Sequence, residues 1–210
     1  VWVVLVLLIV KKNCVLIGEA GNDVDVPLRA KVFVVSSEPA ANPNHLVCAK
    51  PRVQLFFNFG TTGADAGAKT YFADDIELGS GSGVGSAIQL PVTFDDTGLD
   101  YEITDFGGVA TTLVADPDNA ANTVASSNKT PAAQLWGGTT VGEVSGFGAL
   151  PFTATDTTMT VRVYSPDAGI PVRLKVEDRT DRTISVETEA TTTVANAWET
   201  LTFDFSAQAA

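Results

Sequence analysis

The chain has 210 residues, a formal net charge of −12 and a single histidine. This length suffices for one large domain with a buried core, or for a smaller domain and a second piece. Such an acidic surface repels phosphate backbones and argues against nucleic-acid binding, and the abundance of Thr, Val, Gly and Asp beside few Lys predicts a turn-rich, all-β fold.

Residues 1–52 form an N-terminal segment that we assign to no known domain. It opens with a wholly apolar run, residues 1–10, followed by Lys11 and Lys12. A membrane span needs about 20 apolar residues, and a signal peptide has its charges before the apolar run. The run is therefore interpreted as a buried strand or as the remnant of a longer precursor, without a membrane span. Cys14 and Cys48 could be bridged or free, and with His45 they match no zinc spacing.

Residues 53–78 predict two strands, at 53–59 and 69–78, joined by a loop at 60–67. A linker at 79–88 follows, because residues 79–85 include four Gly and two Ser.

Residues 89–210 predict a series of short strands separated by turns. The strands are expected at 89–94, 101–106, 109–115, 158–164, 172–176, 183–188 and 199–205. Turn signals such as Asp116-Pro117-Asp118-Asn119 and Ser165-Pro166-Asp167 separate them. This pattern is typical of a β-sandwich of the jelly-roll kind.

Several short motifs carry a more specific resemblance. They include Pro91-Val92-Thr93-Phe94-Asp95-Asp96, Thr104-Asp105-Phe106-Gly107-Gly108, Gln134-Leu135-Trp136-Gly137-Gly138, Val161-Arg162-Val163-Tyr164-Ser165-Pro166 and Trp198-Glu199-Thr200-Leu201-Thr202-Phe203-Asp204-Phe205. Together they make residues 90–205 resemble the jelly-roll carbohydrate-binding modules appended to secreted polysaccharidases of marine bacteria, such as agarases, laminarinases and alginate lyases. The resemblance implies a secreted or cell-surface protein that binds a polysaccharide and does not cleave it.

The order of the strands departs from that pattern. In such modules the strand like Phe203-Asp204-Phe205 is followed by strands like Phe56-Phe57-Asn58-Phe59-Gly60 and Tyr71-Phe72-Ala73-Asp74-Asp75-Ile76, which here come first. The chain therefore resembles a circular permutant, or the tail of one module joined to the head of another. We predict that residues 53–78 close the same sandwich, within the chain or by strand exchange with a neighbouring copy.

Catalysis is not expected from this chain. With His45 as the lone histidine, far upstream, no Ser-His-Asp set is credible. Glycosidases need only two carboxylates, but the acidic pairs here lie at strand ends and turns, where such residues are common.

Sugar binding requires an aromatic ring and nearby polar side chains. Trp136, between polar Lys129 and Gly137-Gly138, is the best candidate ring, and its alternative is a core position. Lys129 is a candidate ligand-binding residue beside it. Alternation places Arg173, Lys175 and Glu177 opposite one set of apolar residues, and Arg162 and Tyr164 opposite another. We expect these residues to form one cleft floor for a polyhydroxylated, even anionic, chain; the alternative is an ordinary solvated face.

The resemblance also implies a structural calcium ion near the first and last strands of the module. Asp95 and Asp96 match the first position, and Asp74 and Asp75 match the second if residues 53–78 close the sandwich. Two other functions stay open: a self-assembling extracellular structural protein built by strand exchange, and a fragment of a secreted polysaccharidase.

Overall fold

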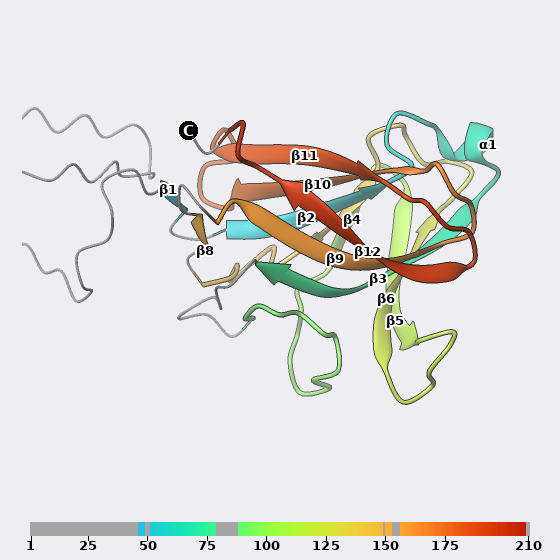
Figure 1. The fold of residues 1–210 in the computed structure, drawn as a ribbon, viewed down its shortest axis with the longest axis horizontal. Coiled ribbons are helices and arrows are strands. Elements are labelled where there is room, and N and C mark those ends of the chain that lie inside the picture. The colour runs from blue at the N-terminus through green and yellow to red at the C-terminus, as the bar shows by residue number, and fades with distance from the viewer. Residues whose placement is uncertain (1–45, 49–50, 79–87, 149, 153–155, 209–210) are drawn as a thin grey trace, which may run out of the picture.

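The computed structural model describes residues 46–48, 51–78, 88–148, 150–152 and 156–208. This part of the chain is nearly all β, and its strands form two antiparallel five-stranded sheets packed face to face, as Figure 1 shows. The expected all-β sandwich is therefore confirmed, whereas jelly-roll connectivity stays a prediction. In the described ranges, no helix is long and apolar enough to cross a membrane.

The first sheet, called here the cleft sheet, contains five strands. In spatial order they are β11 (Ser185–Thr191), β10 (Pro171–Asp178), β2 (Pro51–Phe57), β7 (Gly138–Val141) and β4 (Thr104–Phe106). The opposite sheet has the order β12 (Ala197–Asp204), β9 (Thr158–Ser165), β3 (Lys69–Leu78), β6 (Thr123–Lys129) and β5 (Val109–Ala115). A short pair, β1 (Leu46–Cys48) and β8 (Leu150–Phe152), completes the described strands.

Residues 53–78 lie at the centre of both sheets. Strand β2 pairs with β10 on one side and β7 on the other, and β3 pairs with β6 and β9. They are therefore central strands of the same sandwich and not its closing strands. Without β2 and β3, each sheet would lose a central strand and the hydrogen bonds that this strand makes to its two neighbours. Of the linker expected at 79–88, residues 79–87 lie outside the described residues, while Ile88 is buried and bridges Phe147. Strand exchange with another copy stays a prediction.

Strict alternation on β9 and β10 builds the core. Met159, Val161 and Val163 from β9 are fully buried, and Val172 and Leu174 from β10 meet the same core from the opposite sheet. Burying side chains of this size stabilises a fold by about 1.5–3 kcal/mol each. The polar residues that alternate with them are thereby forced onto the two outer faces.

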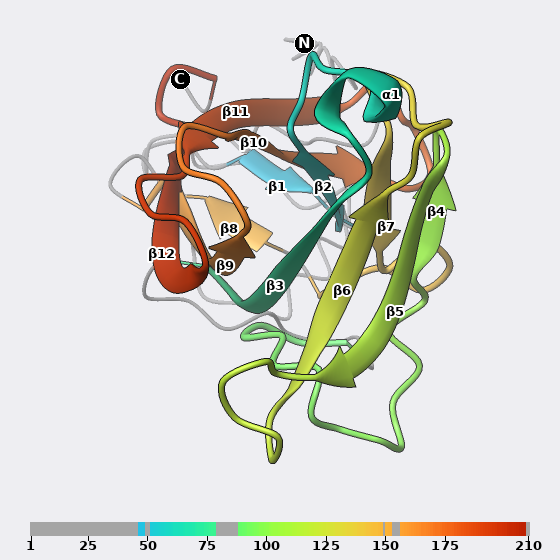
Figure 2. The ribbon, with the colours of Figure 1, turned by 90° about the vertical axis from the view of Figure 1, so that its right-hand side faces the viewer.

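The loop between β2 and β3 contains a one-turn helix, α1 (Gly63–Ala66), which was expected to be irregular. Thr62 caps its N-terminus by accepting a hydrogen bond from Asp65 N at 3.2 Å, and Gly67 ends it in the left-handed conformation (φ 78°). Figure 2 shows α1 at the end of the sandwich where the chain crosses between the sheets.

Other expectations differ from the structure in detail. Residues 89–94 form no strand; they make one bridge, between Val92 and Ile76, while Val92 and Phe94 pack into the core. Strands β6 and β7 were not expected, since they carry few apolar residues. The expectations for Cys14, His45 and residues 1–10 fall outside the described residues.

Candidate functional site

The outer face of the cleft sheet carries a cleft of about 490 Å³. Its floor comes from strands β2, β4, β7 and β10, and its rim comes from the loops that follow β6, β7 and β10. The lining residues are Arg52, Gln54, Phe56, Thr104, Phe106, Trp136, Thr140, Glu143, Lys175, Glu177 and Arg182. The cleft therefore combines aromatic rings with a dense set of polar groups.

A row of aromatic rings crosses this sheet face. Phe59 meets Phe56 edge-on at 5.7 Å between centroids, and Phe56 meets Phe106 edge-on at 5.3 Å. Trp136 lies nearly parallel to Phe106, with 6.4 Å between centroids. Trp136 is 50% exposed. It is therefore not a core residue, and its ring is accessible to a ligand.

Glycines make room for this row. A Cβ on Gly138 would lie 2.6 Å from the Leu55 carbonyl oxygen and 2.9 Å from the Phe106 ring. Gly107 has a φ of 62°, and a Cβ there would lie 3.0 Å from the Trp136 ring. Gly107 and Gly138, one from each Gly-Gly pair, therefore provide the surface on which the rings of Trp136 and Phe106 rest.

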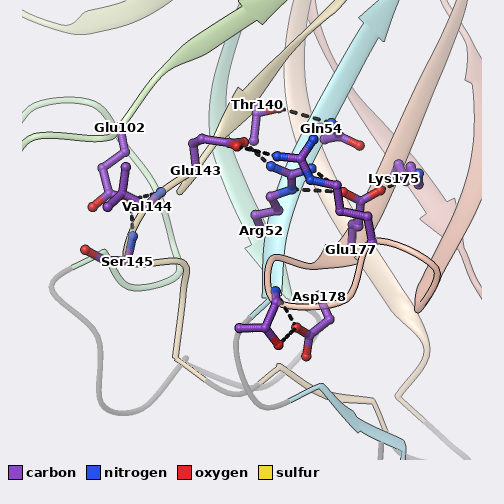
Figure 3. A network of polar contacts seen from close by, with 12 residues as sticks. Arg52, Gln54, Glu102, Thr140, Glu143, Val144, Ser145, Lys175, Glu177 and Asp178 are labelled. Atoms are coloured by element: carbon purple, nitrogen blue, oxygen red, sulfur yellow. Dashed lines mark hydrogen bonds and ion pairs between the residues drawn. The ribbon is translucent and has the colours of Figure 1, made fainter. Parts of the chain in front are cut away.

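A chain of alternating charges lines the same cleft as the rings. Figure 3 shows its contacts. Arg52 donates to both Glu143 and Glu177, Arg182 donates to Glu143 at 3.0 Å, and Lys175 donates to Glu177 at 2.5 Å. Strand register brings the pairs together, because Glu177 lies opposite Arg52 and Lys175 lies opposite Gln54. Arg52 and Glu177 are almost fully buried, at 3% and 4% side-chain exposure, so this charge network is built into the cleft floor.

Two neighbouring loops hold the outer members of the network in place. Glu102 accepts hydrogen bonds from the backbone N–H groups of Val144 and Ser145, at 2.8 and 2.6 Å, and so fixes the loop that carries Glu143. Burial opposes ionisation of Glu102, but these bonds outweigh it and lower its pKa. Asp178 likewise accepts from Thr180 N at 2.8 Å in the loop that carries Arg182 (Figure 3).

Four of the predicted ligand-binding residues share this sheet face. Trp136, Lys175 and Glu177 line the cleft, and Arg173 lies beside it, over the Phe59 ring at 3.6 Å. Arg173 also pairs with Glu187 at 2.6 Å and Glu189 at 2.5 Å across the neighbouring strand. The predicted alternation of β10 therefore brings its polar residues to the cleft.

Arg162 and Tyr164, in contrast, lie on the outer face of the opposite sheet. Arg162 bridges Asp74 and Asp116, each at 3.3 Å, and stacks 4.0 Å from the Trp198 ring. Tyr164 packs edge-on against Trp198. The expectation of a single cleft floor is wrong for these two residues, because consecutive strands β9 and β10 belong to different sheets and the alternation of each points away from the shared core.

The prediction that Lys129 binds the ligand is also wrong. It is 1% exposed, and its ammonium group donates to the carbonyl oxygens of Phe57 and Asn58 at 3.1 and 2.9 Å. Its side chain points into the sandwich because Lys129 shares the inner face of β6 with buried Ser127, two residues away, and alternates with exposed Asn128. Lys129 therefore ties β6 to the end of β2 and is not accessible to a ligand.

This buried lysine predicts a pH effect on stability. Burial lowers the pKa of Lys129 to about 8, from 10.5. Between these values the unfolded state binds more protons, so the contribution of Lys129 to the free energy of unfolding rises with pH across this window. We expect wild type to gain about 1–3 kcal/mol over Lys129→Met from pH 7.5 to 10.5 in urea unfolding. Parallel profiles for the two proteins would contradict the assignment, and Lys69→Met serves as the control at a surface lysine.

The four predicted calcium ligands lie in the described part of the chain. Asp74 is buried, and its Oδ2 accepts from Arg162 and Asn122, while Asp95 accepts from Thr123 N at 2.8 Å and Asp96 from Gly98 N at 2.9 Å. Within the described ranges, no group of three or more His, Cys, Asp or Glu side chains, Asp75 included, is placed to hold a metal ion. Calcium at these residues stays a prediction.

Several cleft residues were not identified from the sequence. They are Arg52, Gln54, Phe56, Thr104, Phe106, Thr140, Glu143 and Arg182. The alternation of Arg52, Gln54 and Phe56 with Val53 and Leu55 was a usable signal for one of these strands. Glu143 and Arg182 lie in loops, where no periodicity marks them.

The chain was also compared with known proteins. No protein family, no curated protein and no solved structure matches it. The sandwich and its cleft therefore carry the functional argument by themselves.

Proposed function

We propose that this chain is a non-catalytic, extracellular module that binds a polysaccharide in the cleft of the cleft sheet. The observation that carries the proposal is the half-exposed Trp136 ring, continued by Phe106 and Phe56 along a cleft that is otherwise lined by polar groups. An aromatic ring packs against the apolar face of a pyranose, and polar side chains satisfy the hydroxyl groups.

The cleft also has the shape that a chain ligand requires. It lies across the strands of an open sheet face, with lining residues from β4 on one side to β10 on the other. The rings are supported from below by glycines, and the charged groups hold one another, so the site is largely formed before a ligand arrives. Such preorganisation lowers the entropic cost of binding.

The carboxylates of the cleft support binding over catalysis. Glu177 accepts from Arg52 and Lys175 through its two oxygens, and Glu143 accepts from Arg52 and Arg182 through its own two. A general acid must deliver a proton to a bound glycosidic oxygen, and its partner must reach the sugar or a water. Glu143 and Glu177 are each held by two cations. This arrangement suits the orientation of those cations as hydrogen-bond donors to a ligand better than it suits proton transfer.

Affinity electrophoresis tests the proposal directly. The purified chain is run in gels that contain agarose, laminarin, alginate or carrageenan, beside Trp136→Ala. We expect at least one glycan to retard the wild type and Trp136→Ala to bind it about 30-fold more weakly, as loss of about 2 kcal/mol at a central aromatic residue implies.

Leu113→Ala is the matched control, because Leu113 is an exposed apolar residue on β5, outside the cleft. It should bind like the wild type, and all three proteins should melt at similar temperatures. A folded wild type that no glycan retards would refute polysaccharide binding and favour the structural-assembly alternative.

A further inference from the structure

The charge network of the cleft ends in a cation on both sides. In the order of their contacts, its members are Arg182, Glu143, Arg52, Glu177 and Lys175. The alternation leaves three cations against two carboxylates, on a chain whose formal net charge is −12. The cleft is therefore a locally cationic site on an acidic protein.

The carboxylates and the cations of the network also differ in how many of their hydrogen-bonding groups are used. Every oxygen of Glu143 and Glu177 already accepts a charge-assisted bond from Arg52, Arg182 or Lys175. Among the described residues, Lys175 uses one of its three N–H donors, on Glu177, and Arg182 uses one N–H group, on Glu143. A ligand in the cleft therefore meets spare cationic donors, whereas each carboxylate oxygen of the network is already paired with a cation.

The two terminal cations are accessible from the cleft. The Arg182 side chain is 67% exposed, whereas Lys175 is partly buried on the cleft floor with Gln54 opposite it. An exposed guanidinium binds carboxylate or sulfate oxygens through paired N–H groups, and a lysine ammonium binds them as a point charge. Both cations border the cleft that contains Trp136.

We infer that the preferred ligand is an anionic polysaccharide, one that carries carboxylate or sulfate groups, and that Lys175 and Arg182 recognise its charge. This inference rests on the proposed function and names the ligand class for the same site. Trp136 packs against the sugar ring, while the two cations select for the charged substituent.

The test compares two pairs of polymers that differ in charge on a common type of backbone. De-esterified and fully methyl-esterified homogalacturonan test the carboxylate, and carrageenan and agarose test the sulfate on a galactan. Wild type, Lys175→Gln, Arg182→Gln and the control Lys69→Gln are measured by affinity electrophoresis. Lys69 is a surface lysine that pairs with Asp167 at 3.1 Å, away from the cleft lining.

We expect the wild type to bind the anionic member of one pair at least ten-fold more tightly than its neutral partner. Lys175→Gln and Arg182→Gln should each lose about ten-fold on that polymer, as loss of a charge-assisted hydrogen bond implies, while Lys69→Gln is unchanged. The polymer pair whose two members differ in affinity shows whether the recognised group is a carboxylate or a sulfate.

Equal binding to both members of each pair, or the same loss in Lys69→Gln, would overturn the charge inference and leave polysaccharide binding intact. Binding to no polymer, with folded protein, would overturn the proposed function as well.

Discussion

Replacing Arg52 with methionine should lower the free energy of unfolding by about 3–5 kcal/mol. Arg52 is 3% exposed and donates to Glu177, which is equally buried, and to Glu143. Removing the cation leaves the Glu177 carboxylate buried with Lys175 as its remaining partner. The cost therefore comes from an undercompensated buried charge more than from lost apolar contact, and urea unfolding at neutral pH measures it.

Two further variants separate these causes. In Arg52→Met/Glu177→Met the stranded charge is gone, so we expect most of the stability to return. Arg173→Met is the matched control, since Arg173 makes similar carboxylate pairs at the sheet surface, where ion pairs are worth about 0–1 kcal/mol. A double variant as unstable as Arg52→Met would show that the packing of the Arg52 side chain, and not its charge, supports the floor.

Gly138→Ala should cost about 2–3 kcal/mol of stability and also weaken glycan binding. Its Cβ would lie 2.6 Å from the Leu55 carbonyl oxygen and 2.9 Å and 3.1 Å from the rings of Phe106 and Phe56. Because β2 is a central strand paired on both sides, its backbone cannot withdraw cheaply, and the two rings must move instead. Movement of Phe106 displaces the support of Trp136.

Thermal unfolding and affinity electrophoresis together test this variant. Gly98→Ala is the control, because Gly98 is exposed and an added Cβ there meets only the end of the Asp96 side chain, at 3.3 Å. Unchanged stability with normal glycan retardation in Gly138→Ala would show that the aromatic row does not depend on this close approach.

Local patterns in the sequence were enough to determine the fold class and several strands. Strands β3 and β5 run over the residues expected for them, and β9 and β10 over nearly the same residues, since alternation of apolar and polar side chains is a property of neighbouring residues. Alternation also predicts that Lys175 and Glu177 face away from the core. The polar and glycine neighbours of Trp136 predict its place at a loop or strand edge.

Tertiary structure decided everything that depends on which sheet a strand joins. Alternation shows that Arg162 and Arg173 both face away from the core, but strand pairing alone places them on opposite sides of the sandwich. In the same way, Lys129 is buried because β6 turns it toward two carbonyl oxygens at the end of β2. Arg52, Glu143 and Arg182 are distant in sequence, and only the pairing of β2 with β7 and β10 brings them together, because hydrogen-bond register is set by the packing of the whole domain and not by any one strand.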